Sequence, residues 1–180
     1  MSGVKLTPTA KVILGFLRFR PRSGYDIKQA VEISTRFFWG ASYGQIYPEL
    51  QRLESAGLVE VEEVAERRRK VYRLTTAGEE ALAEWLRGGY GDLFQYRDEG
   101  MLRLFFSDFV DEEAALENVR RMRASRDEVL GFLRAEIEPH AQQDTDAGMP
   151  SPLRALHLGL AMLEAQKDWL AALEAELKAR

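Results

Sequence analysis

The sequence predicts a mainly α-helical protein with one small two-stranded β-wing, divided into two domains. Apolar residues recur at helical spacing over most of the 180 residues. One short region, residues 58–74, alternates apolar and charged residues on both sides of a charged tip, as the strands of a hairpin do. The segment "RGGYGDLFQY" then separates this region from a second half with helical patterns only. We therefore expect domains at 1–87 and 97–180, joined by a linker at 88–96.

Local end signals place the elements of the first domain. A threonine cap followed by proline opens the first helix, the capping boxes "SGYD" and "SYGQ" open the second and third, and glycine after Ala56 stops the third. We expect helices at 8–20, 23–34, 42–56 and 75–87, and strands at 58–64 and 70–74. The order helix, helix, helix, strand, strand, helix is that of a winged helix-turn-helix.

The second domain is expected to be an α-helical dimerisation domain. The patterns predict a short helix at 97–109, a long helix at 111–137, a polar loop at 138–152 and a last helix from residue 152. The last helix carries an apolar stripe that would expose a large apolar area if it stood alone, so we expect it to pair with a second chain. The stripe consists of Leu153, Leu156, Leu160, Leu163 and Leu170.

Composition argues against an enzyme. The chain has no cysteine, which excludes disulfides, thiolate metal sites and cysteine nucleophiles. The only histidines, His140 and His157, are not in metal-ligand spacing, and no nucleophile elbow, phosphate-binding loop or H-E-x-x-H motif is present. We expect no catalytic residue, no metal and no cofactor. The N-terminus lacks the apolar core of a signal peptide and no apolar run approaches about 20 residues, so a cytoplasmic location is expected.

Charge is distributed unevenly between the two halves. The net charge is −4, but residues 1–87 carry 14 Lys and Arg against 11 Asp and Glu, a balance of +3, whereas the rest of the chain has a balance of −7. A basic half joined to an acidic half indicates that the first half meets a polyanion. Chance variation in solvated charge is the alternative.

The third expected helix has one apolar and one polar face. Ile46, Leu50 and Leu53 share the core side on a helical wheel. The polar face can bond to base edges and phosphates in a major groove, although an ordinary solvated face is the alternative. Pro48 either sets the angle of the first turns or is a tolerated kink. The polar face comprises Gly44, Pro48, Gln51, Arg52 and Ser55, with Gln45 close by and Tyr43 and Tyr47 at its boundary.

The tip of the predicted hairpin is strongly cationic. It carries Arg67, Arg68, Arg69 and Lys70 in succession. Such a tip can enter a minor groove or hold phosphates, although charged tips also occur for solubility alone.

A further hypothesis concerns a small-molecule effector. Aromatic side chains near the domain boundary could line a pocket for an aromatic ligand, with ordinary core packing as the alternative. These residues are Trp85, Phe94, Tyr96, Phe105, Phe106 and Trp169.

Five segments of the sequence resemble the PadR family of transcriptional regulators. They are "LTPTAKVILGFL", "RPRSGYDIKQAV", "FWGASYGQIYPELQRLESAGLVEVE", "RRRKVYRLTTAGEEAL" and "RDEGMLRLFFSDF", and they follow one another over the first hundred or so residues. The longer helical second half is similar to the family's larger subgroup, in which it serves as a dimerisation module.

The resemblance implies a homodimer that binds double-stranded DNA at a palindromic operator, usually as a repressor. It implies a wing at 59–74 and a recognition helix at 42–56 that contacts DNA through Ser42, Tyr43, Gln45, Tyr47 and Arg52. Some members of the family respond to phenolic acids or drugs. Two alternatives stay open: a protein-interaction module whose winged domain no longer binds DNA, and a small-molecule sensor with the same DNA output.

Overall fold

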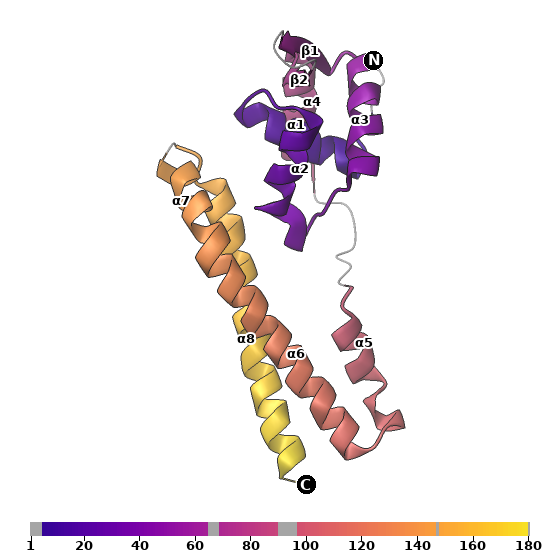
Figure 1. The fold of residues 1–180 in the computed structure, drawn as a ribbon, viewed down its shortest axis with the longest axis vertical. Helices are drawn as coiled ribbons and strands as arrows, with labels where there is room; N and C mark the ends of the chain where they lie inside the picture. The colour runs from indigo at the N-terminus through magenta and orange to yellow at the C-terminus, as the bar shows by residue number, and fades with distance from the viewer. Residues whose placement is uncertain (1–4, 65–68, 90–96, 147, 180) are drawn as a thin grey trace. The chain divides into compact units, whose positions relative to one another are not determined.

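The computed structural model describes residues 5–64, 69–89, 97–146 and 148–179. The chain forms two compact units, Met1–Gly91 and Asp92–Arg180. In the described residues, the first unit contains helices and a two-stranded sheet, and the second unit contains helices only (Figure 1).

The first unit has the predicted element order. Helices α1, α2 and α3 precede the hairpin, a 3-10 turn η1 (Thr35–Phe37) follows α2, and α4 follows the hairpin. The winged helix-turn-helix predicted from the end signals is confirmed. The bounds are α1 Pro8–Phe19, α2 Gly24–Glu32, α3 Tyr43–Ser55, β1 Val59–Val64, β2 Arg69–Leu74 and α4 Thr76–Arg87.

The hydrogen bonds and backbone angles at the helix ends agree with the predicted end signals. Thr7 Oγ1 accepts a hydrogen bond from Ala10 N–H at 3.0 Å and so caps α1. Ser23 and Asp26 form a capping box at the start of α2. Gly57 follows α3 with φ +70°, a conformation that L side chains rarely adopt, so a glycine ends this helix at low cost.

The hydrophobic core of the first unit is formed by the apolar side of α3 together with neighbouring elements. Side chains from α1, α2, α3 and β1 are fully buried there, among them Ile13, Leu14, Ile27, Val31, Ile46, Leu50, Leu53 and Val59. Burying each such side chain stabilises the fold by roughly 1.5–3 kcal/mol. α3 is therefore held on the domain by its apolar side.

The hairpin is fixed to the rest of the unit by backbone pairing. β1 and β2 are antiparallel, with Val59 opposite Leu74. Arg22, between α1 and α2, exchanges two backbone hydrogen bonds of 3.0 and 2.8 Å with Tyr72 of β2. The wing thus pairs with the segment that introduces the helix-turn-helix.

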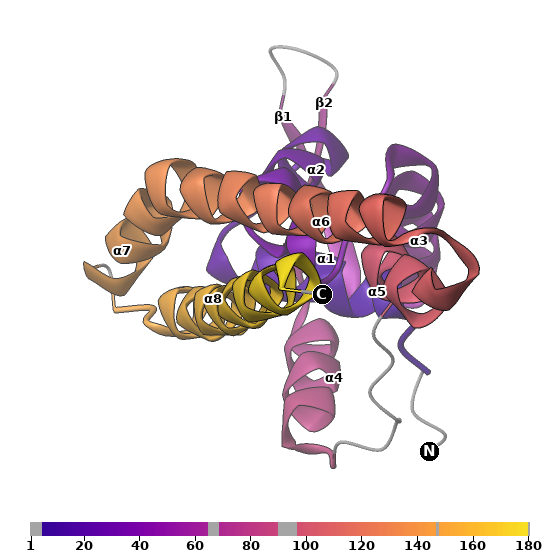
Figure 2. The ribbon, with the colours of Figure 1, turned by 90° about the horizontal axis from the view of Figure 1, so that it is seen from below.

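The second unit is built around two long helices, α6 and α8, which run side by side (Figure 2). Two buried clusters join them: Leu130, Leu133, Ile137 and Leu160 form one, and Val119, Met122 and Leu170 form the other. None of the helices in the described residues is long and apolar enough to span a bilayer. The bounds are α5 Glu99–Phe105, η2 Ser107–Phe109, α6 Glu112–Phe132, η3 Leu133–Ile137, α7 Glu138–Asp146 and α8 Ser151–Lys178.

The polar loop predicted at 138–152 is wrong for its first nine residues. A π-helical turn, η3, continues α6 directly into α7. The wider turn precedes Pro139, whose ring and missing N–H do not fit a regular helix interior. α7 packs against α8 and buries Ala141, so tertiary contact stabilises a helix with weak local signals.

The leucine stripe of α8 has its partner helix within the same chain. Leu160 and Leu170 are buried in the two clusters with α6 and η3, and Leu156 and Leu163 pack against the first cluster. Leu153 is partly buried. The stripe therefore has a partner helix within the chain, and its part in dimerisation stays a prediction. The large apolar side chains that α8 leaves exposed are Leu158, Met162 and Trp169.

Candidate nucleic-acid interface

α3 presents its polar face to solvent because its apolar face is fully buried. The predicted contacts of this helix that are exposed are Ser42, Tyr43, Gln45, Tyr47 and Gln51. The helix continues through Pro48 without a break, and Gly44 is exposed. Five of the residues predicted on and beside this helix are thus accessible to a DNA duplex.

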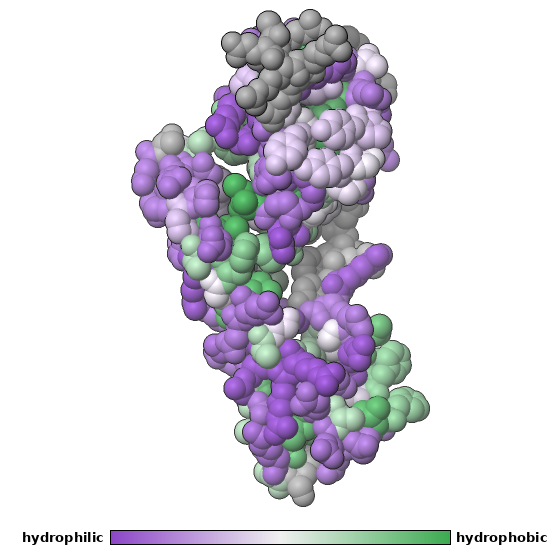
Figure 3. Space-filling model, viewed as in Figure 1, coloured by the Kyte–Doolittle hydropathy of each residue, from purple (hydrophilic) through white to green (hydrophobic). Residues whose placement is uncertain are grey.

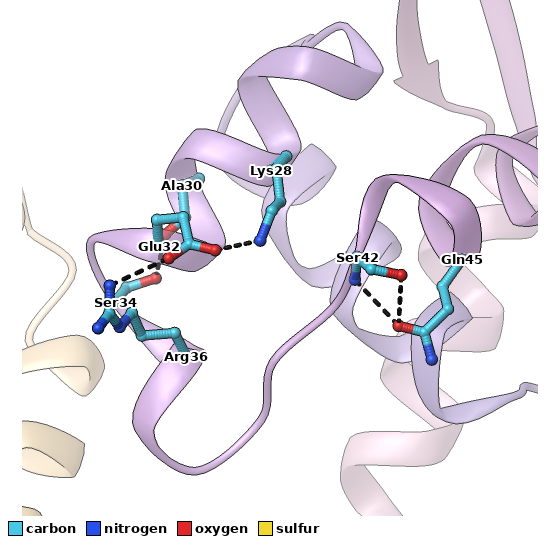
Figure 4. A network of polar contacts seen from close by, with 7 residues as sticks. All are labelled: Lys28, Ala30, Glu32, Ser34, Arg36, Ser42 and Gln45. Atoms are coloured by element: carbon cyan, nitrogen blue, oxygen red, sulfur yellow. Dashed lines mark hydrogen bonds and ion pairs between the residues drawn. The ribbon is translucent and has the colours of Figure 1, made fainter.

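Gln45 already takes part in the cap of its own helix. Its Oε1 accepts hydrogen bonds from Ser42 N–H at 2.9 Å and from Ser42 Oγ–H at 3.1 Å (Figure 4). A glutamine that reads adenine uses its oxygen and its nitrogen together. With the oxygen engaged, the Gln45 amide can offer only its N–H donors, which suit the acceptors of guanine or thymine.

Arg52 lies in an ion pair instead of extending freely from the helix. Its Nη2 is 2.6 Å from Glu49 Oε1, and its Nε lies 3.1 Å from each Glu49 oxygen. Thr7 Oγ1 also donates to Glu49 Oε1 at 2.6 Å, which joins α3 to the cap of α1. The predicted DNA contact through Arg52 would have to compete with this structural role.

The ion pair between Glu49 and Arg52 shifts the pKa of each residue in the direction that favours its charged form. Hydrogen bonding to Arg52 lowers the pKa of Glu49, opposed by burial and assisted by the Thr7 bond. Hydrogen bonding to Glu49 raises the pKa of Arg52. Both groups therefore stay charged at neutral pH.

Three tyrosines from two helices form a stack on the surface, which we call the tyrosine stack. The ring centroids of Tyr25 and Tyr43 are 6.4 Å apart with an interplanar angle of 17°, and those of Tyr43 and Tyr47 are 6.2 Å apart at 21°. The three residues are 52, 40 and 45% exposed. Tyr43 and Tyr47 were predicted contacts, whereas Tyr25 of α2 was missed.

Lys28 is the charged neighbour of the tyrosine stack. Its Nζ lies 6.0 Å from the centroid of the Tyr43 ring and pairs with Glu32, which in turn pairs with Arg36 at 3.2 Å (Figure 4). The Lys28 hydrogen bond lowers the pKa of Glu32.

The signal for Tyr25 was the likeness between "SGYD" and "SYGQ", since each box places a tyrosine in the first turn of a helix.

The wing residues are described only in part. Arg67 and Arg68 lie outside the described residues, as do the side-chain surroundings of Arg69, which begins β2. Lys70 is exposed on β2. Contact of the wing with DNA stays a prediction.

The predicted effector residues fall on several elements. Phe94 and Tyr96 lie outside the described residues. Trp85 is on α4, and the centroid of its ring lies 5.2 Å from Lys11 Nζ. Trp169 is exposed on α8. Phe105, the last residue of α5, and Phe106 directly after it pack edge to face with ring centroids 5.0 Å apart.

A hollow of about 420 Å³ between α5 and α6 is lined mainly by charged and polar residues. It contains none of the six predicted aromatic residues and is lined by Asp98, Glu99, Gly100, Arg103, Asn118, Arg121, Met122, Ser125 and Arg126. The aromatic effector pocket therefore stays a prediction. In the described residues, no three His, Cys, Asp or Glu side chains form a group that could hold a metal ion.

Two family models match the chain. The transcriptional regulator PadR-like family matches residues 13–84, which include the winged helix-turn-helix, and the model named virulence activator alpha C-term matches residues 96–178.

Characterised proteins share the same organisation over nearly the whole chain. The negative transcriptional regulator PadR of Bacillus subtilis is 29% identical over 169 residues, which cover 92% of this chain and 93% of the relative. Its crystal structure with p-coumaric acid has a TM-score of 0.79 at 25% identity and covers 96% of this chain and 99% of that one. Its structure with operator DNA has a TM-score of 0.84 at 24% identity, with coverages of 97 and 99%, which shows the same fold.

The matched proteins are transcriptional regulators and not enzymes. Residues 13–84 of the chain thus match the PadR-like family of transcriptional regulators, and the chain has the organisation of the matched regulators, a winged helix followed by a helical C-terminal unit.

Proposed function

We propose that this regulator is a homodimeric repressor that binds a palindromic operator through α3 of each subunit. The observation that carries the proposal is the exposed polar and tyrosine-rich face of α3, held rigidly by the fully buried Ile46, Leu50 and Leu53. A helix of this kind suits a major groove. The relative that matches most of the chain is a negative regulator, which supports repression as the sign of control.

A homodimer is supported by apolar surface on the second unit. α5 and the residues after it expose Met101, Leu102, Phe105, Phe106, Phe109 and Val110. The corresponding surface is hydrophobic over α5 and the turn that follows it (Figure 3). Contiguous apolar patches of this kind mark interaction sites in soluble proteins. A second copy is the fitting partner, because a palindromic operator requires two-fold symmetry.

We also propose that an aromatic small molecule relieves operator binding. The support is the Bacillus subtilis relative, whose crystal structure contains p-coumaric acid. A phenolic acid panel tested by quenching of Trp85 and Trp169 fluorescence checks this, with displacement of labelled operator as the second readout. No quenching and no displacement across the panel would count against an aromatic effector.

The test of operator binding is a mobility shift with the DNA upstream of the regulator's own gene, against scrambled DNA of equal length. We expect salt-sensitive, sequence-selective retention at micromolar protein or below, with loss of binding as salt rises. Footprinting should then protect two inverted half-sites about one helical turn apart, roughly 34–36 Å. If the folded protein binds neither the upstream DNA nor the scrambled DNA at low salt, the proposal is wrong, and a protein-interaction module is favoured.

A further inference from the structure

The tyrosine stack is held in place by the backbone of α2. A Cβ added at Gly24 would lie 2.7 Å from Tyr47 Cε1, so the Tyr47 ring rests directly against the start of α2. Gly24 is buried. The close approach ties the first turn of α2 to the first two turns of α3.

Filling the core does not explain the stack. Fully buried aliphatic side chains already complete the apolar side of α3, and each tyrosine keeps 40% or more of its surface exposed. Tyrosine offers a large contact area and a hydroxyl at low conformational-entropy cost, because it has only two side-chain torsions. Stacking between neighbours lowers that cost further, so the three phenols are preorganised for a partner.

The position of Tyr25 indicates which partner. In a helix-turn-helix the second helix enters the major groove while the first helix crosses the sugar–phosphate backbone. Tyr25 is the second residue of the first of these helices, α2, and stacks on the first residue of the second, α3. Tyrosine hydroxyls are among the groups that contact phosphate and sugar and so set the register of a protein on DNA.

We propose that the tyrosine stack is a phosphate-docking surface for duplex DNA, in which Tyr25 donates its hydroxyl to a backbone phosphate. The Tyr43 ring transmits the resulting register to α3. Gly24 provides the space that keeps the Tyr47 ring in the stack. This inference rests on the proposed function, and it assigns Tyr25 and Gly24 as positioning residues outside the recognition helix.

A neutral hydroxyl predicts a distinctive salt response. Only cationic side chains release counterions when they meet phosphates, so loss of a tyrosine hydroxyl leaves the slope of affinity against salt unchanged. Loss of a lysine or arginine contact would reduce that slope by about one. Lys28, the cation beside the stack, is already paired with Glu32. The proposed contact between Tyr25 and a phosphate uses the neutral hydroxyl alone.

The experiment measures fluorescence anisotropy of labelled operator and scrambled duplexes with the full-length protein, over about 50 to 200 mM salt. Tyr25→Phe keeps the ring and removes the hydroxyl, and Gly24→Ala displaces the Tyr47 ring. Phe19→Leu, a change at another exposed aromatic residue of the same unit, controls for the first change. Gly15→Ala, where an added Cβ meets nothing within 4 Å, controls for the second.

We expect Tyr25→Phe to weaken binding to both duplexes by about tenfold with an unchanged salt slope, since a hydrogen bond to a charged group is lost. Gly24→Ala should reduce the preference for operator over scrambled DNA, and both controls should bind as wild type. If wild type binds operator and Tyr25→Phe binds equally well, or if its salt slope falls by about one, the inference is wrong. If wild type binds neither duplex, the proposed function fails with it.

Discussion

Glu49 joins the recognition helix to the start of the chain's first helix. Its carboxylate accepts hydrogen bonds from Thr7 of the α1 cap and from Arg52 one turn further along α3. The side chain is only 12% exposed, so both partners are needed to compensate its burial. These hydrogen bonds help to hold α3 against the start of α1.

Replacing Glu49 with glutamine should lower the free energy of unfolding at pH 7 by about 1 kcal/mol. The estimate uses charge-assisted hydrogen bonds, discounted because Arg52 is 38% exposed. The folded pKa of Glu49 lies below the ordinary value of about 4.3. Its contribution is therefore complete above about pH 4.3 and disappears as the pH falls through the folded pKa.

Denaturant melts at pH 7 and at lower pH check this expectation. The difference between wild type and Glu49→Gln should shrink as the pH decreases. Glu80→Gln, which changes an exposed carboxylate of α4, serves as the control and should change stability little. A constant difference at every pH would contradict an electrostatic role for Glu49.

Gly78 is required by close packing at the start of α4. A Cβ at this position would lie 2.0 Å from the backbone oxygen of Leu58, and backbone cannot move aside as a flexible side chain can. Gly78→Ala should lower the free energy of unfolding by about 1–3 kcal/mol or more. Thermal melts against Gly15→Ala test this, because alanine at that open helical site should be neutral or stabilising by about 0.5–1 kcal/mol. A neutral Gly78→Ala would show that α4 can shift.

At the scale of the element, α3 combines strong local signals with one residue that opposes them. The capping box starts the helix and Gly57 ends it, yet Pro48 stands inside. Proline there cannot donate to the carbonyl of Gly44 four residues back. The helix persists because its apolar side is fully buried, which outweighs the lost hydrogen bond.

Pro48→Ala should raise the free energy of unfolding by about 2 kcal/mol. Removing an interior proline stabilises the folded helix by about 3 kcal/mol. Losing the proline also gives the unfolded chain more conformational entropy, which stabilises the unfolded state by up to about 1 kcal/mol. We also expect weaker operator binding, because Pro48 follows directly on Tyr47 and shapes the turns that carry the tyrosine stack.

Thermal melts and the anisotropy assay measure the two effects of Pro48→Ala separately. Pro8→Ala is the matched control, since proline at the first position of α1 interrupts no helical hydrogen bond. Unchanged operator affinity in a stabilised Pro48→Ala variant would mean that the proline is only a tolerated kink.

At the scale of the whole molecule, the second unit exposes apolar side chains on α5 and η2 that suit the interface of the proposed dimer. Phe105 is 78% exposed and Phe109 is 88% exposed. The five stripe leucines of α8 are partly or fully buried within the chain, so they do not supply this surface. We therefore expect the proposed dimer to use α5 and η2, while dimerisation through the α8 stripe stays a prediction.

Changing Phe105 and Phe109 together to serine should convert the dimer to a monomer. Because both rings are exposed in the single chain, their loss should leave the helical unit folded. Sedimentation velocity at tens of micromolar checks the mass, and circular dichroism checks the fold. Leu86→Ser removes another exposed apolar side chain, on α4, and should leave the dimer intact. A monomeric wild type would contradict the proposal.

Most of the fold could be predicted from the sequence because its signals act over a few residues. Ser23, Ser42 and Gly57 mark helix ends through bonds and backbone conformations that are local to each end. The periodicity of Ile46, Leu50 and Leu53 predicted the buried side of α3 correctly. α7 was missed because its stability comes from packing on α8, which no local pattern announces.

The candidate site was predicted only in outline. The sequence determined by itself that α3 would be a capped, amphipathic helix with a polar outer face, since capping and periodicity need no distant residue. The tertiary structure alone decided that Arg52 pairs with a carboxylate tied to Thr7, that Tyr25 joins the recognition helix, and that the leucine stripe pairs with α6. Each of these depends on residues far apart in the chain meeting in space, and spacing along one helix carries no information about which distant side chain it will meet.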